Sequence, residues 1–175
     1  MRGGTSKGVF LRQSDLPTDP ASRDRLILTI LGSPDKRQID GLGGADPLTS
    51  KVCIIGPPSE RARARGAQLS YTFGQVGIDI AVVDYSGLCG NLTAAVGCYA
   101  ILENVIPVVE PVTSVRIYNT NHDCMLTCEV PVENGLPKES GDFVVPGVPG
   151  KGAKIQVDFA DTAGASTGSV LPTGN

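Results

Sequence analysis

The sequence predicts an α+β lobe in which roughly six strands surround one buried central helix, with a second helix outside. Residues 90–107 are apolar on almost every side, which is typical of a helix enclosed in a core. Short runs rich in β-branched residues lie on both sides of that segment, separated by clusters of Gly, Pro and Asn. With 175 residues, of which 41% are hydrophobic, the chain is long enough to bury one core.

The outer helix is the clearest local element. Asp19 suits the N-cap, Pro20 suits the first helical position, and Gly32 favours an end to the helix. The apolar residues between them predict one helix over residues 20–31. Asn91 is the expected N-cap of the central helix.

The strands are predicted by β-branched or alternating runs. Residues 50–55 form a short run closed by Gly56-Pro57-Pro58, which suits a buried strand. Residues 68–76 alternate apolar and polar positions, which predicts a strand buried on one face only. Four further strand-like runs follow the central helix, at residues 112–118, 124–132, 143–145 and 155–159.

Charge and hydropathy exclude several classes of partner. Lys and Arg number 15 against 18 Asp and Glu, so the net charge is only -3. This balance gives no electrostatic reason to expect nucleic acid or an anionic membrane surface as partner. The longest uncharged stretch, residues 85–102, contains three glycines and is too polar to span a bilayer. The expected partners are therefore small molecules or protein.

The cysteines and the chain ends suggest the cellular setting. Five cysteines, an odd number without a framework spacing, favour free thiols in a reducing compartment, so a cytoplasmic location is predicted. No signal peptide is evident at the N-terminus. The chain opens on a Gly-rich segment and stops on a turn signal at residues 171–175, so we expect it to be part of a longer protein.

Cys89 is the strongest chemical feature, because it directly precedes the predicted central helix. Unpaired N–H groups and the positive end of a helix dipole stabilise a thiolate and also bind carboxylates. Cys89 is therefore a candidate nucleophile or acid–base group. A buried thiol that packs as a small apolar side chain is the alternative, and position alone does not decide between the two.

Lys51 follows the Gly-rich residues 41–50 at the mouth of an apolar strand. Partial burial would desolvate its amine and favour the neutral form, which can accept a proton. Position alone favours the alternative, a lysine whose amine extends to water. Cys53 lies on the same strand face, so we expect it in the site or beneath it.

The N-terminal segment and the histidine region carry weaker signals. Residues 2–8 combine hydroxyls, cations and glycines, as an anion-binding loop would, but the spacing does not match a P-loop. A metal site at His122, Cys124 and Cys128 is not expected, because two cysteines four residues apart on a strand stand about 13 Å apart. His122 is either a surface or capping residue or a partner of Cys89.

Six short motifs span the chain from end to end. They are Arg2-Gly-Gly-Thr-Ser-Lys-Gly8, Thr49-Ser-Lys-Val, Tyr71-Thr-Phe-Gly-Gln-Val76, Cys89-Gly-Asn91 with Ala95-Val-Gly, residues 162–168, and Leu171-Pro-Thr-Gly-Asn175. In this order they resemble the 2-methylaconitate cis-trans isomerase (PrpF) family, which includes 4-oxalomesaconate tautomerases and aconitate isomerases.

The resemblance implies a fold similar to that of diaminopimelate epimerase. Such proteins have two lobes, each a curved mixed β-sheet wrapped around a central buried helix, with the active site between them. Residues 1–175 then correspond to the N-terminal lobe, without its first strand and without the second lobe. The implied activity is cofactor-independent isomerisation, by proton transfer, of small unsaturated di- or tricarboxylic acids such as aconitate, methylaconitate or oxalomesaconate.

The resemblance also implies roles for individual residues. Lys51 and Cys89 match the catalytic proton-transfer residues, and no metal is expected. Leu88 departs from the family's usual Asn, which removes a hydrogen-bond donor beside Cys89. The residues expected to bind the anionic substrate are Arg2, Thr5, Ser6, Ser50, Gly90 and Asn91.

Two other functions stay open. A cofactor-independent amino-acid racemase or epimerase of the same fold would need a second cysteine facing Cys89, whereas Lys51 takes that part in an isomerase. A truncated, catalytically inactive half is the other alternative, because a cleft without its facing lobe is open to water. Pairing of two copies into a homodimer would rebuild a cleft.

Overall fold

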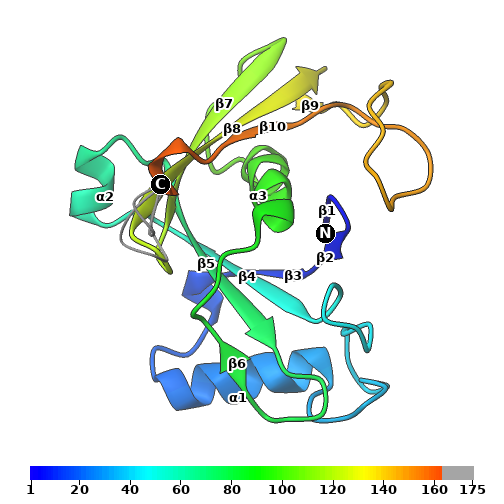
Figure 1. Cartoon of the computed structure of the whole chain (residues 1–175). Coiled ribbons are helices and arrows are strands. Elements are labelled where there is room, and N and C mark those ends of the chain that lie inside the picture. Colours follow the sequence, from blue (N-terminus) through cyan, green and yellow to red (C-terminus); the bar gives the residue numbers. More distant parts are fainter. Residues whose placement is uncertain (163–175) are drawn as a thin grey trace, which may run out of the picture.

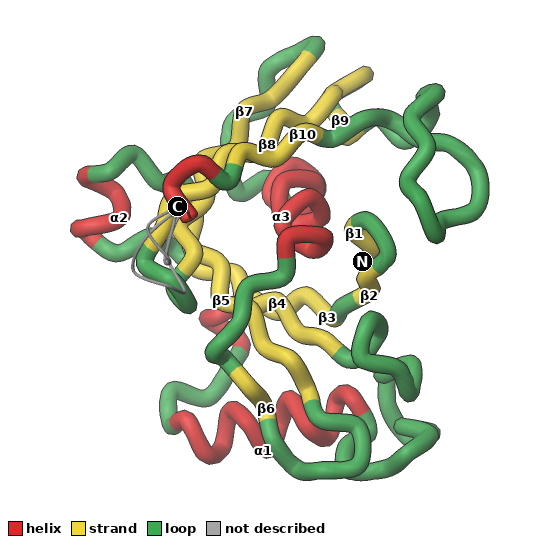
Figure 2. The backbone as a smooth tube through the Cα atoms, in the orientation of Figure 1, coloured by secondary structure: helices red, strands yellow, loops and turns green. Residues whose placement is uncertain are grey.

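A curved sheet wraps around helix α3 (Gly90–Leu102) in the computed structural model, which describes residues 1–162 (Figure 1). The motif at 171–175, and the motif at 162–168 apart from Thr162, lie outside that range. The sheet follows an arc past α3, whereas α1 (Pro20–Leu31) lies on the outer side of the sheet (Figure 2). The predicted α+β lobe with a curved sheet around a central helix is confirmed.

The sheet is mixed and, within residues 1–162, has eight strands. Six of them follow the order β10-β8-β7-β5-β4-β3, while β6 pairs with β5 and β9 pairs with β8. The pairs β3–β4 and β5–β7 are parallel and the others are antiparallel. The strands are β3 (Val9–Arg12), β4 (Lys51–Gly56), β5 (Leu69–Val76), β6 (Val83–Asp84), β7 (Val112–Asn119), β8 (Cys124–Glu133), β9 (Leu136–Pro137) and β10 (Gln156–Asp158).

Helix α3 is enclosed because it offers apolar or small residues in every direction. Its residues share one core with side chains from β4, β5, β7 and β8. At Gly97 the contact with β8 is close enough that a Cβ would lie 2.5 Å from Cys128 Sγ. The helix ends at Leu102, five residues before the predicted end, because Asn104 turns the backbone into the left-handed region with φ 53°.

Helix α1 has the boundaries that its end signals predict. Asp19 Oδ2 accepts a hydrogen bond from Ser22 N at 2.8 Å, and Gly32 ends the helix with φ 77°. The buried Ile27 and Leu31 pack on the outer face of the sheet in a second apolar cluster. This helix therefore covers the face of β4 and β5 that α3 does not.

The prediction that residues 68–76 are buried on one face only is wrong. Both faces of β5 are covered, because α3 packs on one and the α1 cluster on the other. Gly74 leaves room on the second face for a side chain of the neighbouring strand, because a Cβ there would lie 2.7 Å from Val52 Cγ1. In a sequence, a small residue on a buried strand face breaks the run of large apolar residues just as a polar residue on an exposed face does. The alternation along residues 68–76 therefore does not show that one face is exposed.

The remaining elements are short. β1 (Arg2–Gly3) and β2 (Ser6–Lys7) form a separate hairpin beside α3, and α2 (Glu60–Ala64) is an unpredicted turn of helix that Ser59 caps. The two 3-10 turns are η1 (Gln13–Asp15) and η2 (Ala160–Thr162). No helix within residues 1–162 is long and apolar enough to cross a membrane.

Two predicted strands are shorter than expected. Residues 143–145 form only an isolated bridge between Phe143 and Gly152, and the run at 155–159 pairs with β8 only over Gln156–Asp158. The Gly- and Pro-rich stretch at 146–152 turns the chain back before a strand can extend.

Candidate functional site

Lys51 is buried at the first position of β4, with 7% of its surface exposed. Side chains alternate across a strand, so Lys51 shares the α3-facing side of the sheet with Cys53. Its Nζ lies 2.5 Å from Gln75 Oε1 and 5.2 Å from the centre of the Phe73 ring. No acidic side chain within residues 1–162 forms an ion pair with Lys51. The amine is therefore largely buried, which position alone did not favour, and it is held by a neutral amide.

Cys89 is the N-cap residue of α3 and is partly exposed. Its Sγ lies 3.7 Å from Ser6 Oγ, and its carbonyl accepts hydrogen bonds from the backbone and the side chain of Thr93, both at 3.1 Å. No described side chain caps the helix, so the N–H groups of Gly90 and Asn91 stay available at the positive end of its dipole. The predicted placement of a thiol at this helix start is confirmed.

The prediction that Asn91 caps α3 is wrong. Asn91 is the second helical residue, and its Nδ2 donates a hydrogen bond to Thr5 Oγ1 at 3.0 Å. The β1–β2 hairpin, rather than the N-terminal end of α3, therefore binds this side chain. Its amide ties the hairpin to the first turn of α3 and leaves the backbone N–H groups of that turn free of a cap.

The Phe73 ring lies near both Lys51 and the loop that carries Cys89. The ring is 5.2 Å from Lys51 Nζ, and a Cβ at Gly87 would lie 3.7 Å from Phe73 Cε1. Leu88 and Cys89 pack against the apolar core around α3. Lys51 and the loop at 87–89 thus border a single aromatic ring.

Cys53 lies beneath the site and is fully buried. Its Sγ is 3.9 Å from the hydroxyl of Tyr71, which is also fully buried. Burial raises the pKa of Cys53 far above its ordinary value, although the nearby Lys51 acts in the opposite direction. Cys53 is therefore a neutral thiol in the floor of the site.

The N-terminal hairpin brings three further predicted residues to the start of α3. Ser6 is 2% exposed and contacts Cys89, while Thr5 accepts the hydrogen bond from Asn91. Arg2 is exposed, and its guanidinium donates to the carbonyl of Gly4 at 2.8 Å. The hydroxyls and the cation expected around an anion therefore lie on one hairpin beside the helix start.

Ser50 does not join this group. Its side chain is fully buried, accepts a hydrogen bond from Gln38 Nε2 at 2.8 Å and donates to the carbonyl of Val76 at 2.9 Å. The strand alternation directs it to the face opposite Lys51. The expected contact between the Ser50 side chain and an anionic substrate has no geometric support, because its hydroxyl is engaged in the fold.

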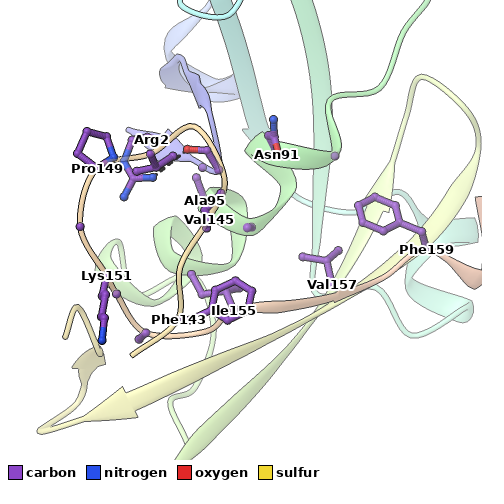
Figure 3. Close-up of a pocket in the computed structure, with 18 residues that line it drawn as sticks. Arg2, Asn91, Ala95, Phe143, Val145, Pro149, Lys151, Ile155, Val157 and Phe159 are labelled. Atoms are coloured by element: carbon purple, nitrogen blue, oxygen red, sulfur yellow. Dashed lines mark hydrogen bonds between the residues drawn. The ribbon is translucent and has the colours of Figure 1, made fainter. Parts of the chain in front are cut away.

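A pocket of about 370 Å³ lies next to the start of α3 (Figure 3). Arg2, Gly90 and Asn91 line it, but Lys51 and Cys89 do not. Figure 3 shows Val157 of β10, and Phe159 just after this strand, directed toward α3. The pocket therefore has both polar and apolar walls, and it adjoins the helix start rather than the pair of predicted catalytic residues.

Comparison with known proteins decides the family. The family described as "PrpF protein" matches residues 1–175. The chain belongs to the PrpF family. The predicted resemblance is thus confirmed.

Named relatives of this PrpF chain are isomerases and tautomerases. It is 58% identical over 175 residues to "3-methylitaconate isomerase" of Eubacterium barkeri, covering 45% of that protein. It is 48% identical over 176 residues to "4-oxalomesaconate tautomerase" of Pseudomonas putida, covering 47%. A crystal structure of "Methylitaconate-delta-isomerase" matches 99% of this chain and 44% of that chain, with 57% identity and a TM-score of 0.93. The chain spans about half the length of the relatives it matches.

The structure of this PrpF chain shows two polar residues near the site that sequence reasoning missed. Gln75 contacts Lys51 directly; it stands in the motif at residues 71–76, but the contact itself follows from the pairing register that places it opposite Lys51. Asn121 joins three parts of the PrpF chain: its side chain bonds Phe73 N and O, both at 2.8 Å, the carbonyl of Tyr85 at 2.7 Å, and Asn119 Nδ2 at 3.0 Å. It therefore anchors the start of the segment that leads to Cys89.

No group of three His, Cys, Asp or Glu side chains within residues 1–162 of the PrpF chain is close enough to hold a metal ion. His122 lies in the turn between β7 and β8, where its backbone N–H donates to Asn119 Oδ1 at 3.0 Å. Cys124 and Cys128 are buried in the core around α3. Their thiols therefore pack as apolar groups.

Proposed function

We propose that this chain is the N-terminal lobe of a two-lobe isomerase that shifts or isomerises the double bond of small unsaturated di- or tricarboxylic acids. The observation that carries the proposal is the enclosed amine of Lys51, held by a neutral amide on the same side of the sheet as Cys89. The named functions of the relatives, with methylitaconate, oxalomesaconate and methylaconitate as the acids, support this substrate class.

The chemistry requires a group that removes a proton from a carbon beside a carboxylate and a group that returns one. A neutral amine at Lys51 accepts the proton, and the thiol of Cys89 donates one at the same or the allylic carbon. The two groups exchange these roles in the reverse direction. Such proton transfer needs only an acid, a base and a site for the anion, so we propose that it proceeds without a cofactor.

The start of α3 supplies the site for the anion. Negative charge that develops on a substrate carboxylate is stabilised by the free N–H groups of Gly90 and Asn91 and by the helix dipole. Ser6 and Thr5 add hydroxyls beside the same turn, and Arg2 adds a positive charge on the hairpin. We assign Ser50 a structural part, since its hydroxyl is engaged by Gln38 and Val76.

In this proposal, a second lobe forms the facing wall of the cleft. It corresponds to the part of the relatives that this chain does not cover. A cleft closed by a second lobe excludes water and strengthens each electrostatic contact with the anion. A pair of copies of this chain is the other arrangement that would cover the start of α3. We also propose a cytoplasmic location, in keeping with five free thiols.

The test is proton exchange into candidate acids. The chain, alone and joined to the part of the Eubacterium barkeri isomerase that it does not cover, is incubated in deuterated water with methylitaconate, 2-methylaconitate and cis-aconitate. Proton NMR follows deuterium incorporation and isomer conversion, and sedimentation reports whether two copies associate. We expect exchange in at least one acid and its loss in both Lys51→Ala and Cys89→Ser.

Cys98→Ser is the matched control, because Cys98 is also a partly exposed thiol of the α3 region. We expect this variant to retain exchange. Exchange that survives Lys51→Ala and Cys89→Ser would refute the assigned site. A folded protein that exchanges none of the acids in either form would refute the proposed function, and exchange at the α-carbon of an amino acid would favour a racemase.

A further inference from the structure

We propose that Gln75 is a positioning residue that fixes the Lys51 amine in the site through its side-chain oxygen. The inference rests on the proposed function for its catalytic meaning, but the contact itself is independent of any substrate. Gln75 lies directly opposite Lys51 in the antiparallel pair β4–β5. Its Oε1 is 2.5 Å from Lys51 Nζ.

The orientation of the Gln75 amide is fixed by its other hydrogen bonds. Both hydrogens of Nε2 are used, since Nε2 donates to the carbonyls of Ser50 at 2.8 Å and Pro47 at 3.1 Å. A flipped amide would bring Oε1 against those two carbonyl oxygens and Nε2 against the lysine amine. Only one orientation therefore satisfies all of these groups, and it directs the oxygen at Lys51.

The surroundings of Lys51 make this contact decisive for the position of its amine. The side chain is 7% exposed, and the Phe73 ring lies 5.2 Å from Nζ. A buried ammonium needs hydrogen-bond acceptors, and Gln75 Oε1 is the side-chain acceptor that the described residues provide. Without it, the four-carbon stem is free to take other rotamers and the amine loses its fixed place.

A neutral partner also suits a group that must gain and lose a proton. A carboxylate at 2.5 Å would stabilise the ammonium strongly and hold the proton on it. An amide oxygen accepts a hydrogen bond from the ammonium and from the neutral amine alike. Gln75 therefore fixes the position of the amine in both protonation states, while the positive charge stays free to attract an anionic substrate.

The direct test is the NMR signal of the Lys51 ammonium in the 175-residue chain labelled with ¹⁵N-lysine. A buried, hydrogen-bonded ammonium exchanges slowly with water, and loss of the signal in Lys51→Ala assigns it. We expect Gln75→Leu to speed the exchange of the ammonium protons with water about tenfold or more, because this variant lacks one charged hydrogen bond. Gln68→Leu is the matched control, because Gln68 accepts one hydrogen bond from Arg116 N and is remote from Lys51 in the β4–β5 register.

Gln75→Glu separates positioning from a purely structural role. Glutamate keeps an oxygen for Lys51 but cannot donate to the Ser50 and Pro47 carbonyls. We expect it to keep the ammonium signal protected, even if its melting temperature falls as far as that of Gln75→Leu. Equal loss of the signal in both variants would mean that Gln75 acts only through the fold, and an unchanged signal in Gln75→Leu would overturn the inference.

The deuterium-exchange assay then measures the catalytic consequence. It uses whichever protein turns over an acid, the chain alone or the joined chain. We expect Gln75→Leu to lower kcat about 10- to 100-fold with KM within about twofold, because it misplaces the base. If no acid is turned over but the ammonium signal depends on Gln75 as predicted, the proposed function fails and the positioning contact stands.

Discussion

Gly3 and Asn91 lie in such close contact that a Cβ at residue 3 would be 2.1 Å from the carbonyl oxygen of Asn91. No side chain fits there without movement of the backbone. The close approach brings the β1–β2 hairpin against the first turn of α3, and with it brings Ser6 within 3.7 Å of Cys89. A glycine thus sets the distance between the hairpin and the helix start.

The first prediction concerns this contact. Gly3→Ala is expected to destabilise the fold by about 1–3 kcal/mol and to expose Cys89, because the hairpin must move away from α3. Thermal unfolding and the rate of thiol labelling at Cys89 measure the two effects. Gly87→Ala serves as the control, since a Cβ there meets only an ordinary 3.7 Å contact with Phe73. Equal stability of the two variants would contradict the prediction.

The second prediction concerns Asn121. Asn121→Ala removes four hydrogen bonds and leaves partly buried backbone groups of Phe73 and Tyr85 without partners. The expected cost in the free energy of unfolding is about 3 kcal/mol. Urea titration measures it, and His122→Ala is the neighbouring control, since no described hydrogen bond involves its side chain. A loss no larger than that of the control would show that the segment before Cys89 is held by other contacts.

The third prediction concerns thiol reactivity and its pH dependence. Burial raises the pKa of Cys98 to about 11 and that of Cys128 to about 12. A raised pKa reduces the reactive thiolate, so at pH 8 roughly a thousandth of Cys98 is ionised and each further pH unit speeds its alkylation about tenfold. Peptide mapping after iodoacetamide treatment should show Cys89 modified first. Modification of Cys128 at pH 8 without unfolding would contradict this order.

The fourth prediction concerns stability in acid. The hydrogen bond from Tyr118, together with Arg61 and Arg65, holds the pKa of Asp123 below its ordinary value. Because the folded state favours the carboxylate, the stabilisation is present at neutral pH and is lost as the pH falls below the ordinary 3.8 through the lowered value.

Asp123→Asn should therefore melt at a lower temperature than the unmodified chain at pH 7, with a difference that shrinks below pH 4. Asp40→Asn is the control, since Asp40 has no described ion pair. A difference that grows on acidification would contradict the assigned contacts.

The elements that the sequence predicts well are those with local end signals. Asp19, Pro20 and Gly32 act within the helix they delimit, so no tertiary knowledge is needed to find α1. The thiol at the start of α3 is likewise local, because an apolar helix directly follows it. By contrast, the side chain of Asn91 has a partner 86 residues away in Thr5, and a local cap prediction cannot anticipate that competition.

The supporting residues of the site escape sequence reasoning for the same reason. Gln75 becomes relevant only through the register that pairs it with Lys51, and Asn121 only through the contact between the β7–β8 turn and β5. Ser50 shows a different difficulty. It is expected at the site because the motif Thr49-Ser-Lys-Val resembles that of the family, but strand alternation sends the side chains of Ser50 and Lys51 to opposite faces.

The burial of most of α3 also bears on how the chain folds during synthesis. The strands β3, β4 and β5 leave the ribosome before α3, whereas β7, β8 and β10 leave after it. Until β8 is made, one side of an almost wholly apolar helix lacks the strands that cover it in the final core. The interval between the synthesis of Leu102 and that of Glu133 is therefore the period in which the nascent chain most needs protection from aggregation.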